Sequence, residues 1–226
     1  MDKDPINESL LLCLKMKEGS GLITQDWAIP HHKNPTLTGA PSWAVLASDK
    51  NVLDFDIANP DFIKILQADT VDLNFTTDDF SLGVWIYANT LSSTSFLFER
   101  GLVNTDGYQF IIGSRGKLVF TTSQGGAIQE TFTDDSTIVT EKWYFLMLTR
   151  SGAVAKIYVN GVNVVTNPVA HTNPLTSARD FRIGTWESEL SPDSFDGKMG
   201  EVYIWERALE PKEIKRLYEM TKGRYE

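Results

Sequence analysis

The sequence contains a single cysteine, Cys13, and has a deficit of positive charge. One thiol cannot form an intrachain disulfide, so packing has to stabilise the fold. The 21 basic residues are outnumbered by 30 acidic ones, which gives a formal net charge of -9. Because a surface of this charge repels phosphate backbones, we expect no nucleic-acid partner.

Long apolar runs are also missing. No run approaches the ~20 residues that a membrane-spanning helix needs, so we expect no membrane insertion. The first residues contain no basic stretch followed by an apolar stretch and a small-residue cleavage site. This predicts that the chain has no signal peptide and is made in the cytoplasm, from which assembly into a virion would still carry it outside a cell.

Alternation of apolar and polar residues with a period of two dominates the chain and indicates β-strands. The clearest case is residues 80–88, where Phe80, Leu82 and Val84 share one face. Residues 143–149 are apolar on both faces, which is typical of a central strand. The pair Asn160-Gly161 predicts a tight hairpin turn. Further strands are expected at residues 10–16, 52–55, 62–66, 108–112, 117–122, 155–159, 162–165, 181–186 and 199–205.

One helix is predicted, at residues 211–220. Pro211 suits its first turn, and Ile214, Leu217 and Tyr218 supply an apolar stripe at helical spacing. A helix this short has to dock on the sheets to be stable. Because no linker interrupts the strands, we expect a single β-sandwich domain over residues 10–226, preceded by an N-terminal arm at 1–9.

The order of several motifs resembles the concanavalin-A-like, laminin-G-like family. Residues 12–21 are similar to the first strand of that family and its Glu-Gly-Ser-Gly turn, and residues 80–86 are similar to its central strand. Residues 143–161 match its Asn-Gly hairpin, and residues 195–205 match its closing strand. A departure is Ile57, where the family often has glycine. The resemblance implies an all-β fold, a concanavalin-A-like jelly-roll β-sandwich with one short C-terminal helix.

This fold hosts lectins, interaction modules, virion parts and some glycoside hydrolases, so the fold alone does not decide the function. A hydrolase needs two carboxylates placed across the scissile bond, and the glucanases of this fold carry Glu-x-Asp-x-x-Glu on one strand. That string is missing here. The nearest approach is Glu187 and Glu189, beside Trp186, in a polar segment that reads as a solvated loop. We therefore expect no catalytic residues and no enzymatic activity.

The resemblance also implies a possible structural calcium ion, because members of the family often bind one where the first loop meets the last strand. The matching carboxylates are Asp26, after the Gly-Ser-Gly turn, and Asp196, before Gly197. A second choice is Asp54 with Asp56. We take Asp26, Asp196 and Asp56 as the candidate metal ligands, since Ca²⁺ prefers carboxylate and carbonyl oxygens.

Sugar binding would use flat aromatic rings, with amides and carboxylates for the hydroxyl groups. Trp27 and Trp186 sit in or beside predicted loops, and Tyr87 lies on the less apolar face of residues 80–88. Asn104 and Asp106 could supply hydrogen bonds. Trp143 and Trp205, in contrast, are expected in the core.

Two functions remain open on these observations. The first is a non-catalytic, lectin-like carbohydrate-binding module displayed on a surface. The second is a virion structural, decoration or tail-associated protein, because residues 217–225 resemble the endings of laminin-G-like proteins of tailed bacterial viruses. The expected partners are a glycan or capsid and tail proteins, with homo-oligomerisation as a further option. Residues 1–9 and the proline-containing loop 26–48 are candidate docking segments or, for the loop, an ordered cover of the sandwich.

Overall fold

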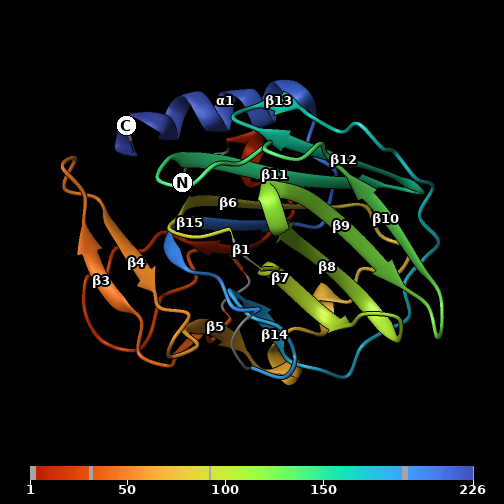
Figure 1. The fold of residues 1–226 in the computed structure, drawn as a ribbon, viewed down its shortest axis with the longest axis horizontal. Helices are drawn as coiled ribbons and strands as arrows, with labels where there is room; N and C mark the ends of the chain where they lie inside the picture. Colours follow the sequence, from red (N-terminus) through yellow and green to blue (C-terminus); the bar gives the residue numbers. More distant parts are fainter. Residues whose placement is uncertain (1–3, 31–32, 92, 190–192, 226) are drawn as a thin grey trace.

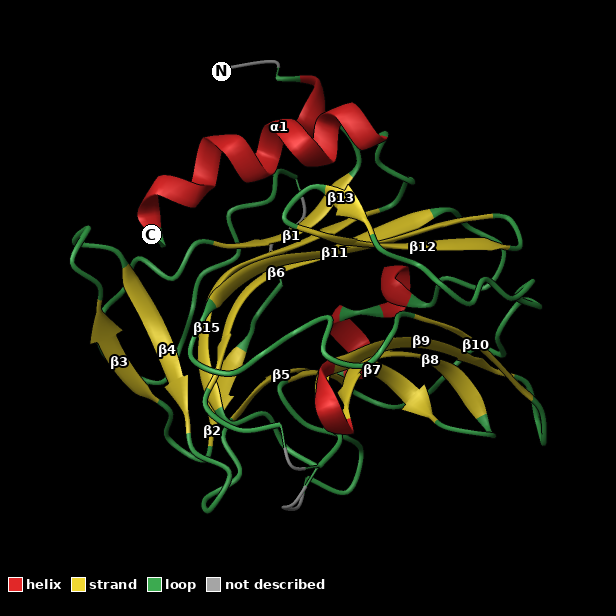
Figure 2. Cartoon of the chain, turned by 45° about the horizontal axis from the view of Figure 1, so that its top comes forward, coloured by secondary structure: helices red, strands yellow, loops and turns green. Residues whose placement is uncertain are grey.

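Two antiparallel sheets face each other in the computed structural model, and one α-helix lies on the outside of the first (Figures 1 and 2). The structure describes residues 4–30, 33–91, 93–189 and 193–225. This arrangement confirms the all-β, concanavalin-A-like sandwich with a short C-terminal helix. Two nine-residue strands, β6 (Phe80–Ala88) and β15 (Gly197–Trp205), pair at the centre of the first sheet, and their inward-facing side chains lie in the main core.

The sheet that contains β6 is called sheet A here, and the other is sheet B. Sheet A runs in the order β13 (Val162–Asn163), β12 (Val154–Val159), β11 (Trp143–Ser151), β6 (Phe80–Ala88), β15 (Gly197–Trp205), β4 (Asn51–Phe55) and β3 (Ser42–Val45), and β1 (Leu10–Leu14) pairs with the second half of β15. Sheet B runs in the order β10 (Ile128–Phe132), β9 (Lys117–Ser123), β8 (Asp106–Gly113), β7 (Ser95–Leu102), β14 (Phe181–Ile183), β5 (Phe62–Ile65) and β2 (Thr36–Thr38). The helix α1 spans Pro211–Thr221, and short 3-10 turns lie at Pro5–Asn7, Gln67–Asp69, Val71–Leu73, Ser114–Gly116 and Lys222–Arg224.

Most of the predicted elements are confirmed. The strand at residues 80–88 has the predicted bounds, and β12 and β13 form the predicted hairpin around Asn160 and Gly161, which both have positive φ. The strand expected at 181–186 is shorter and ends at Ile183, because Gly184 takes a φ of 96° that a continuing strand would not adopt. The sequence did not predict β2, β3, β7 and β10. Two of these, β2 and β3, lie in the loop expected at 26–48, so β2 adds this part of the chain to sheet B and β3 adds it to sheet A.

The main core fills the space between the sheets, as the period-two alternation requires. Phe80, Leu82 and Val84 from β6 face Phe110 and Phe120 from sheet B, and all five are fully buried. Packing of this kind gives most of the stabilisation of a sandwich, at about 25 cal/mol for each Å² of apolar surface removed from water.

A second core lies on the outer face of sheet A, under α1. It joins Trp85 and Trp205 on the sheet to Ile214, Leu217 and Tyr225 from the C-terminal segment. This docking is the one that the amphipathic stripe of the helix predicts. It also places the outward-facing Trp85 in a buried setting, with an exposed fraction of 2%.

The N-terminal segment from Asp4 onward lies against the same part of the sandwich. The indole Nε1 of Trp205 donates a hydrogen bond to the carbonyl oxygen of Ile6 at 2.6 Å, and Arg216 on α1 pairs with Asp4 at 2.7 Å. Ile6 is buried in the second core. Among the described residues, none of the helices has the length and apolar character needed to cross a membrane.

Candidate functional site

Trp27 lies on the loop that follows β1, and the residue before it fixes its position. The Oδ1 atom of Asp26 accepts hydrogen bonds from the backbone N–H groups of Cys13 and Ala28, each at 2.9 Å. Its Oδ2 atom accepts one from the N–H of Lys33 at 2.9 Å. The N–H of Trp27 donates to the carbonyl of Cys13 at 2.8 Å. These bonds hold the loop on the edge of β1 and leave the Trp27 side chain 42% exposed.

Two lysines flank the exposed indole. The Nζ atom of Lys17 lies 4.8 Å from the centre of the Trp27 ring, and that of Lys15 lies 5.5 Å from it. Such cation–π contacts hold the ammonium groups at the ring. Within the described part of the chain, neither lysine has a carboxylate oxygen within 4.0 Å, although the chain as a whole is acidic.

The exposed ring borders two hollows. The larger, of about 820 Å³, runs between the loop and the end of α1, and Lys15, Lys17, Asn51 and Glu201 line it together with Trp27. The smaller, of about 530 Å³, holds polar groups of Gln25 and Asn34 beside apolar side chains of the same loop. Both volumes fall within the range of ordinary small-molecule sites. An exposed aromatic ring between two hollows with amide groups is an arrangement that can bind a sugar.

The other predicted ligand residues lie elsewhere. Trp186 is half-buried and stacks on Phe96, with 6.3 Å between the ring centres, and Tyr87 lies beside Trp143 on the outer face of sheet A. Tyr87 also has the Nζ atom of Lys198 at 5.2 Å from its ring. The structure therefore does not bring Trp27, Trp186 and Tyr87 into one platform.

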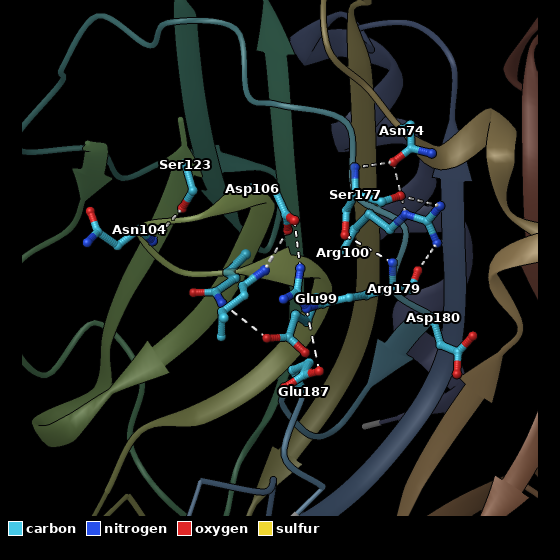
Figure 3. Close-up of polar contacts among 12 residues, drawn as sticks. Asn74, Glu99, Arg100, Asn104, Asp106, Ser123, Ser177, Arg179, Asp180 and Glu187 are labelled. Carbon is cyan, nitrogen blue, oxygen red and sulfur yellow. Dashed lines mark hydrogen bonds and ion pairs between the residues drawn. The ribbon is translucent and has the colours of Figure 1, made fainter. Parts of the chain in front are cut away.

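Asp106 and the segment that carries Trp186 are connected through one arginine. Arg179 contacts both Asp106 and Glu187 (Figure 3). Its Nη1 atom lies 2.6 Å from Asp106, and its Nε atom lies 3.5 Å from Glu187. The second oxygen of Asp106 accepts from the N–H of Leu102 at 3.0 Å. Asn104, in the same turn, is exposed, and its N–H donates to the hydroxyl of Ser123. Asp106 thus holds the chain in place, while Asn104 remains accessible.

The two glutamates considered for hydrolysis are held by ion pairs. Glu189 accepts from Arg182 at 2.9 Å and from Lys64 at 3.0 Å, above the outer face of sheet B. Glu187 contacts Arg179 in a similar way. Both residues lie in a loop, as expected, but their half-exposed side chains are paired with cations. Carboxylates that are already neutralised by cations are poorly suited to act as a nucleophile and a general acid.

Sequence reasoning missed a polar row that crosses the outer face of sheet B. The register pairs Glu99 with Gln109 on one side and with Arg182 on the other. The row continues through Thr121, Glu130 and Lys64. Each is a polar member of the alternating pattern, but only strand pairing brings them into line, and pairing cannot be read from one sequence.

Glu99 is the buried centre of this row. Its Oε1 atom accepts a hydrogen bond from Nε2 of Gln109 at 3.1 Å, and its Oε2 atom has no hydrogen-bond partner in the described part of the chain. Burial raises the pKa of Glu99 to about 8, while Arg182 acts in the opposite direction. The carboxyl group is therefore mostly protonated at neutral pH.

The predicted calcium ligands do not gather around one point. Asp56 and Asp196 line a hollow of about 550 Å³, whereas Asp26 lines a different one and uses both oxygens for backbone N–H groups. The Oδ1 atom of Asp56 accepts from the N–H of Ala58 at 2.8 Å. Over the described ranges, no three His, Cys, Asp or Glu side chains are placed to hold a metal ion. The structure therefore separates Asp26 from Asp56 and Asp196, and calcium binding by any of the three stays a prediction.

Comparison with known proteins identifies the family of the fold. Residues 66–215 match a laminin-G-type family model described as the concanavalin A-like lectin/glucanases superfamily. A search of curated protein sequences gave no match.

Solved structures with the same fold include the binding domain of botulinum neurotoxin serotype C1, at 20% sequence identity and a TM-score of 0.73 over 95% of this chain and 52% of that one. The binding domain of botulinum neurotoxin DC in complex with SialylT matches at 18% sequence identity and a TM-score of 0.70. The same domain in complex with rat synaptotagmin II matches at 17% sequence identity and a TM-score of 0.71. Each match covers 95% of this chain and 52% of the other. The chain thus spans about half the length of these relatives, and the likeness concerns the fold.

Proposed function

Because the chain belongs to the concanavalin A-like lectin/glucanase superfamily, we propose that it is a non-catalytic carbohydrate-binding module whose ligand binds at Trp27. The observation that carries the proposal is the exposed indole, held outward by the hydrogen bonds of Asp26 and placed between two hollows. A large aromatic ring usually packs inside a protein, so an exposed indole on a fixed loop is well placed to bind a ligand.

The chemistry of the site suits a sugar. The apolar face of a pyranose ring can stack on the indole, and the amides of Gln25, Asn34 and Asn51 can exchange hydrogen bonds with its hydroxyl groups. Binding domains of the same fold, one solved in complex with SialylT, support a binding role. The ion pairs of Glu187 and Glu189 support the proposal that the module binds and does not cleave.

The same loop favours a second candidate function, protein–protein contact, including that of a virion protein. Leu22, Ile23 and Ile29, on this loop, are 55%, 63% and 67% exposed, and Ile23 and Ile29 line the smaller hollow together with Trp27. Branched aliphatic side chains do not stack on sugars as aromatic rings do, but they are common in the centre of protein interfaces. A patch of this kind would suit a capsid or tail protein, or a second copy of the chain.

A glycan array separates the two functions. We expect the wild-type chain to bind a defined set of glycans and the Trp27→Ala variant to lose that binding. The matched control is Ile128→Ala, because Ile128 is also 42% exposed but lies on β10 of sheet B. Absence of glycan binding by the correctly folded wild-type chain would overturn the proposal. Sedimentation of the same sample as a dimer or larger assembly would then favour protein contact.

A further inference from the structure

We infer that the ligand of the larger hollow is an acidic sugar, with its carboxylate or sulfate group held by Lys15 and Lys17 beside the Trp27 ring. The inference rests on the proposed carbohydrate-binding function and adds the chemical class of the ligand. It follows from the distribution of charge around the indole and from an unsatisfied acceptor in the wall of the same hollow.

The two lysines provide positive charge that this acidic chain does not neutralise. Several other lysines are paired with carboxylates, as in Lys33 with Asp72 at 2.6 Å and Lys64 with Glu189 at 3.0 Å. Among the described residues, the Nζ atoms of Lys15 and Lys17 contact only the Trp27 ring, at 5.5 and 4.8 Å from its centre. Two ammonium groups at one exposed indole attract the anionic group of a ligand, and the uncharged sugar ring of that ligand can stack on the indole.

The backbone between the lysines directs them to the ring. Met16 is fully buried and has a φ of 48°, an uncommon value for a residue with a side chain. Its burial anchors the segment in the main core, so the residues before and after it extend toward the hollow. The fold therefore sets where both lysine side chains leave the backbone, and their cation–π contacts hold the Nζ atoms at the ring.

The wall of the hollow contains an acceptor for a hydroxyl group. Glu201 is 2% exposed, and its Oε2 atom is buried without a hydrogen-bond partner in the described chain. Its Oε1 atom contacts Arg224, and Lys50 lies 3.8 Å away, so the negative charge of Glu201 is compensated. A polyhydroxylated ligand can satisfy the free oxygen, whereas a simple anion cannot.

The test is an array that carries sialylated, sulfated, uronic-acid and neutral glycans, probed with the full chain. We expect the bound glycans to be acidic, and binding to weaken about tenfold in the double variant Lys15→Gln/Lys17→Gln. Raising the salt concentration should weaken the wild type more than the double variant, because salt screens exposed ion pairs. The matched control is Lys117→Gln/Lys142→Gln, since these lysines also lie over aromatic rings, those of Phe132 and Tyr144, away from the hollow.

The outcomes separate the two claims. Binding to neutral glycans that depends on Trp27 would overturn the inference and leave the proposed function standing. Binding to acidic glycans that survives in Lys15→Gln/Lys17→Gln would also overturn it, because the anion would be held elsewhere. A wild-type chain that binds no glycan at all would overturn the proposed function and the inference together.

Discussion

The rings of Trp85 and Tyr225 stack with their centres 4.3 Å apart and their planes 16° apart. Trp85 lies on β6 in the middle of sheet A, and Tyr225 is the last residue that the structure describes. The contact fixes the end of the C-terminal segment on the sheet and closes one side of the second core. Since Arg224 and Thr221 also line the larger hollow, the same contact shapes the proposed binding site.

Removing the hydroxyl group of Tyr225 should destabilise the protein by about 1–2 kcal/mol, because that oxygen accepts a hydrogen bond from the buried N–H of Glu201 at 2.9 Å. The Gly200→Ala variant should cost about 1–3 kcal/mol, since a Cβ atom there would lie too close to the Tyr225 ring and hydroxyl. Urea unfolding of Tyr225→Phe and Gly200→Ala, with Tyr218→Phe as the control, measures both losses of stability. A Gly200→Ala chain as stable as the wild type would show that Tyr225 does not pack as described.

Asp26→Ala should destabilise the protein by roughly 2–4 kcal/mol, whether or not calcium is present. The substitution leaves the N–H groups of Cys13, Ala28 and Lys33 without their acceptor. Thermal unfolding with added calcium and with excess chelator is the measurement. The control is Asp135→Ala, where an exposed ion pair with Arg115 is lost at little cost. A loss that occurs only in the presence of calcium would instead make Asp26 a metal ligand.

Glu99→Gln should remove a pH dependence of stability. Burial raises the pKa of Glu99 to about 8, above its ordinary value of 4.5, so the folded state retains a proton that the unfolded chain releases. The contribution of Glu99 to stability is thus complete below about pH 4.5 and is lost as the pH rises through about 8.

Between about pH 5 and about pH 9, the free energy of unfolding of the wild type should fall by a few kcal/mol more than that of Glu99→Gln. Glu130→Gln, a half-buried position in the same polar row, serves as the control. Parallel pH profiles for the wild type and Glu99→Gln would contradict the assignment of a protonated Glu99.

His171 should make the protein less stable as the pH falls, whereas Glu99 makes it less stable as the pH rises. It is buried between the hydroxyl groups of Thr122 and Thr131, at 2.9 and 3.0 Å, and burial together with Arg150 lowers its pKa to about 4 from 6.5. The unfolded chain therefore takes up a proton first as the pH falls, and stability is lost between about pH 6.5 and about pH 4. An NMR titration of the His171 ring gives the pKa directly, and a midpoint near 6.5 would refute the prediction.

The sequence by itself determined the fold class and much of its detail. Alternation with a period of two is a local property, so the bounds of β6 and the face that Phe80 and Leu82 bury could be read directly. The turn at Asn160 and Gly161 is equally local, because it depends on positive φ at two neighbouring residues. The apolar stripe of α1 likewise predicted that the helix docks on a sheet.

Only the tertiary structure decided what the candidate residues do. Asp26 and Asp196 could be paired on a sequence motif, but in the fold one accepts backbone N–H groups and the other lines a separate hollow. Trp27 and Trp186 looked equivalent as loop tryptophans, yet one is exposed between two lysines and the other stacks on Phe96. The physical reason is that burial, ion pairing and strand register join residues far apart in the chain, and those long-range contacts decide whether a side chain holds the fold or meets a ligand.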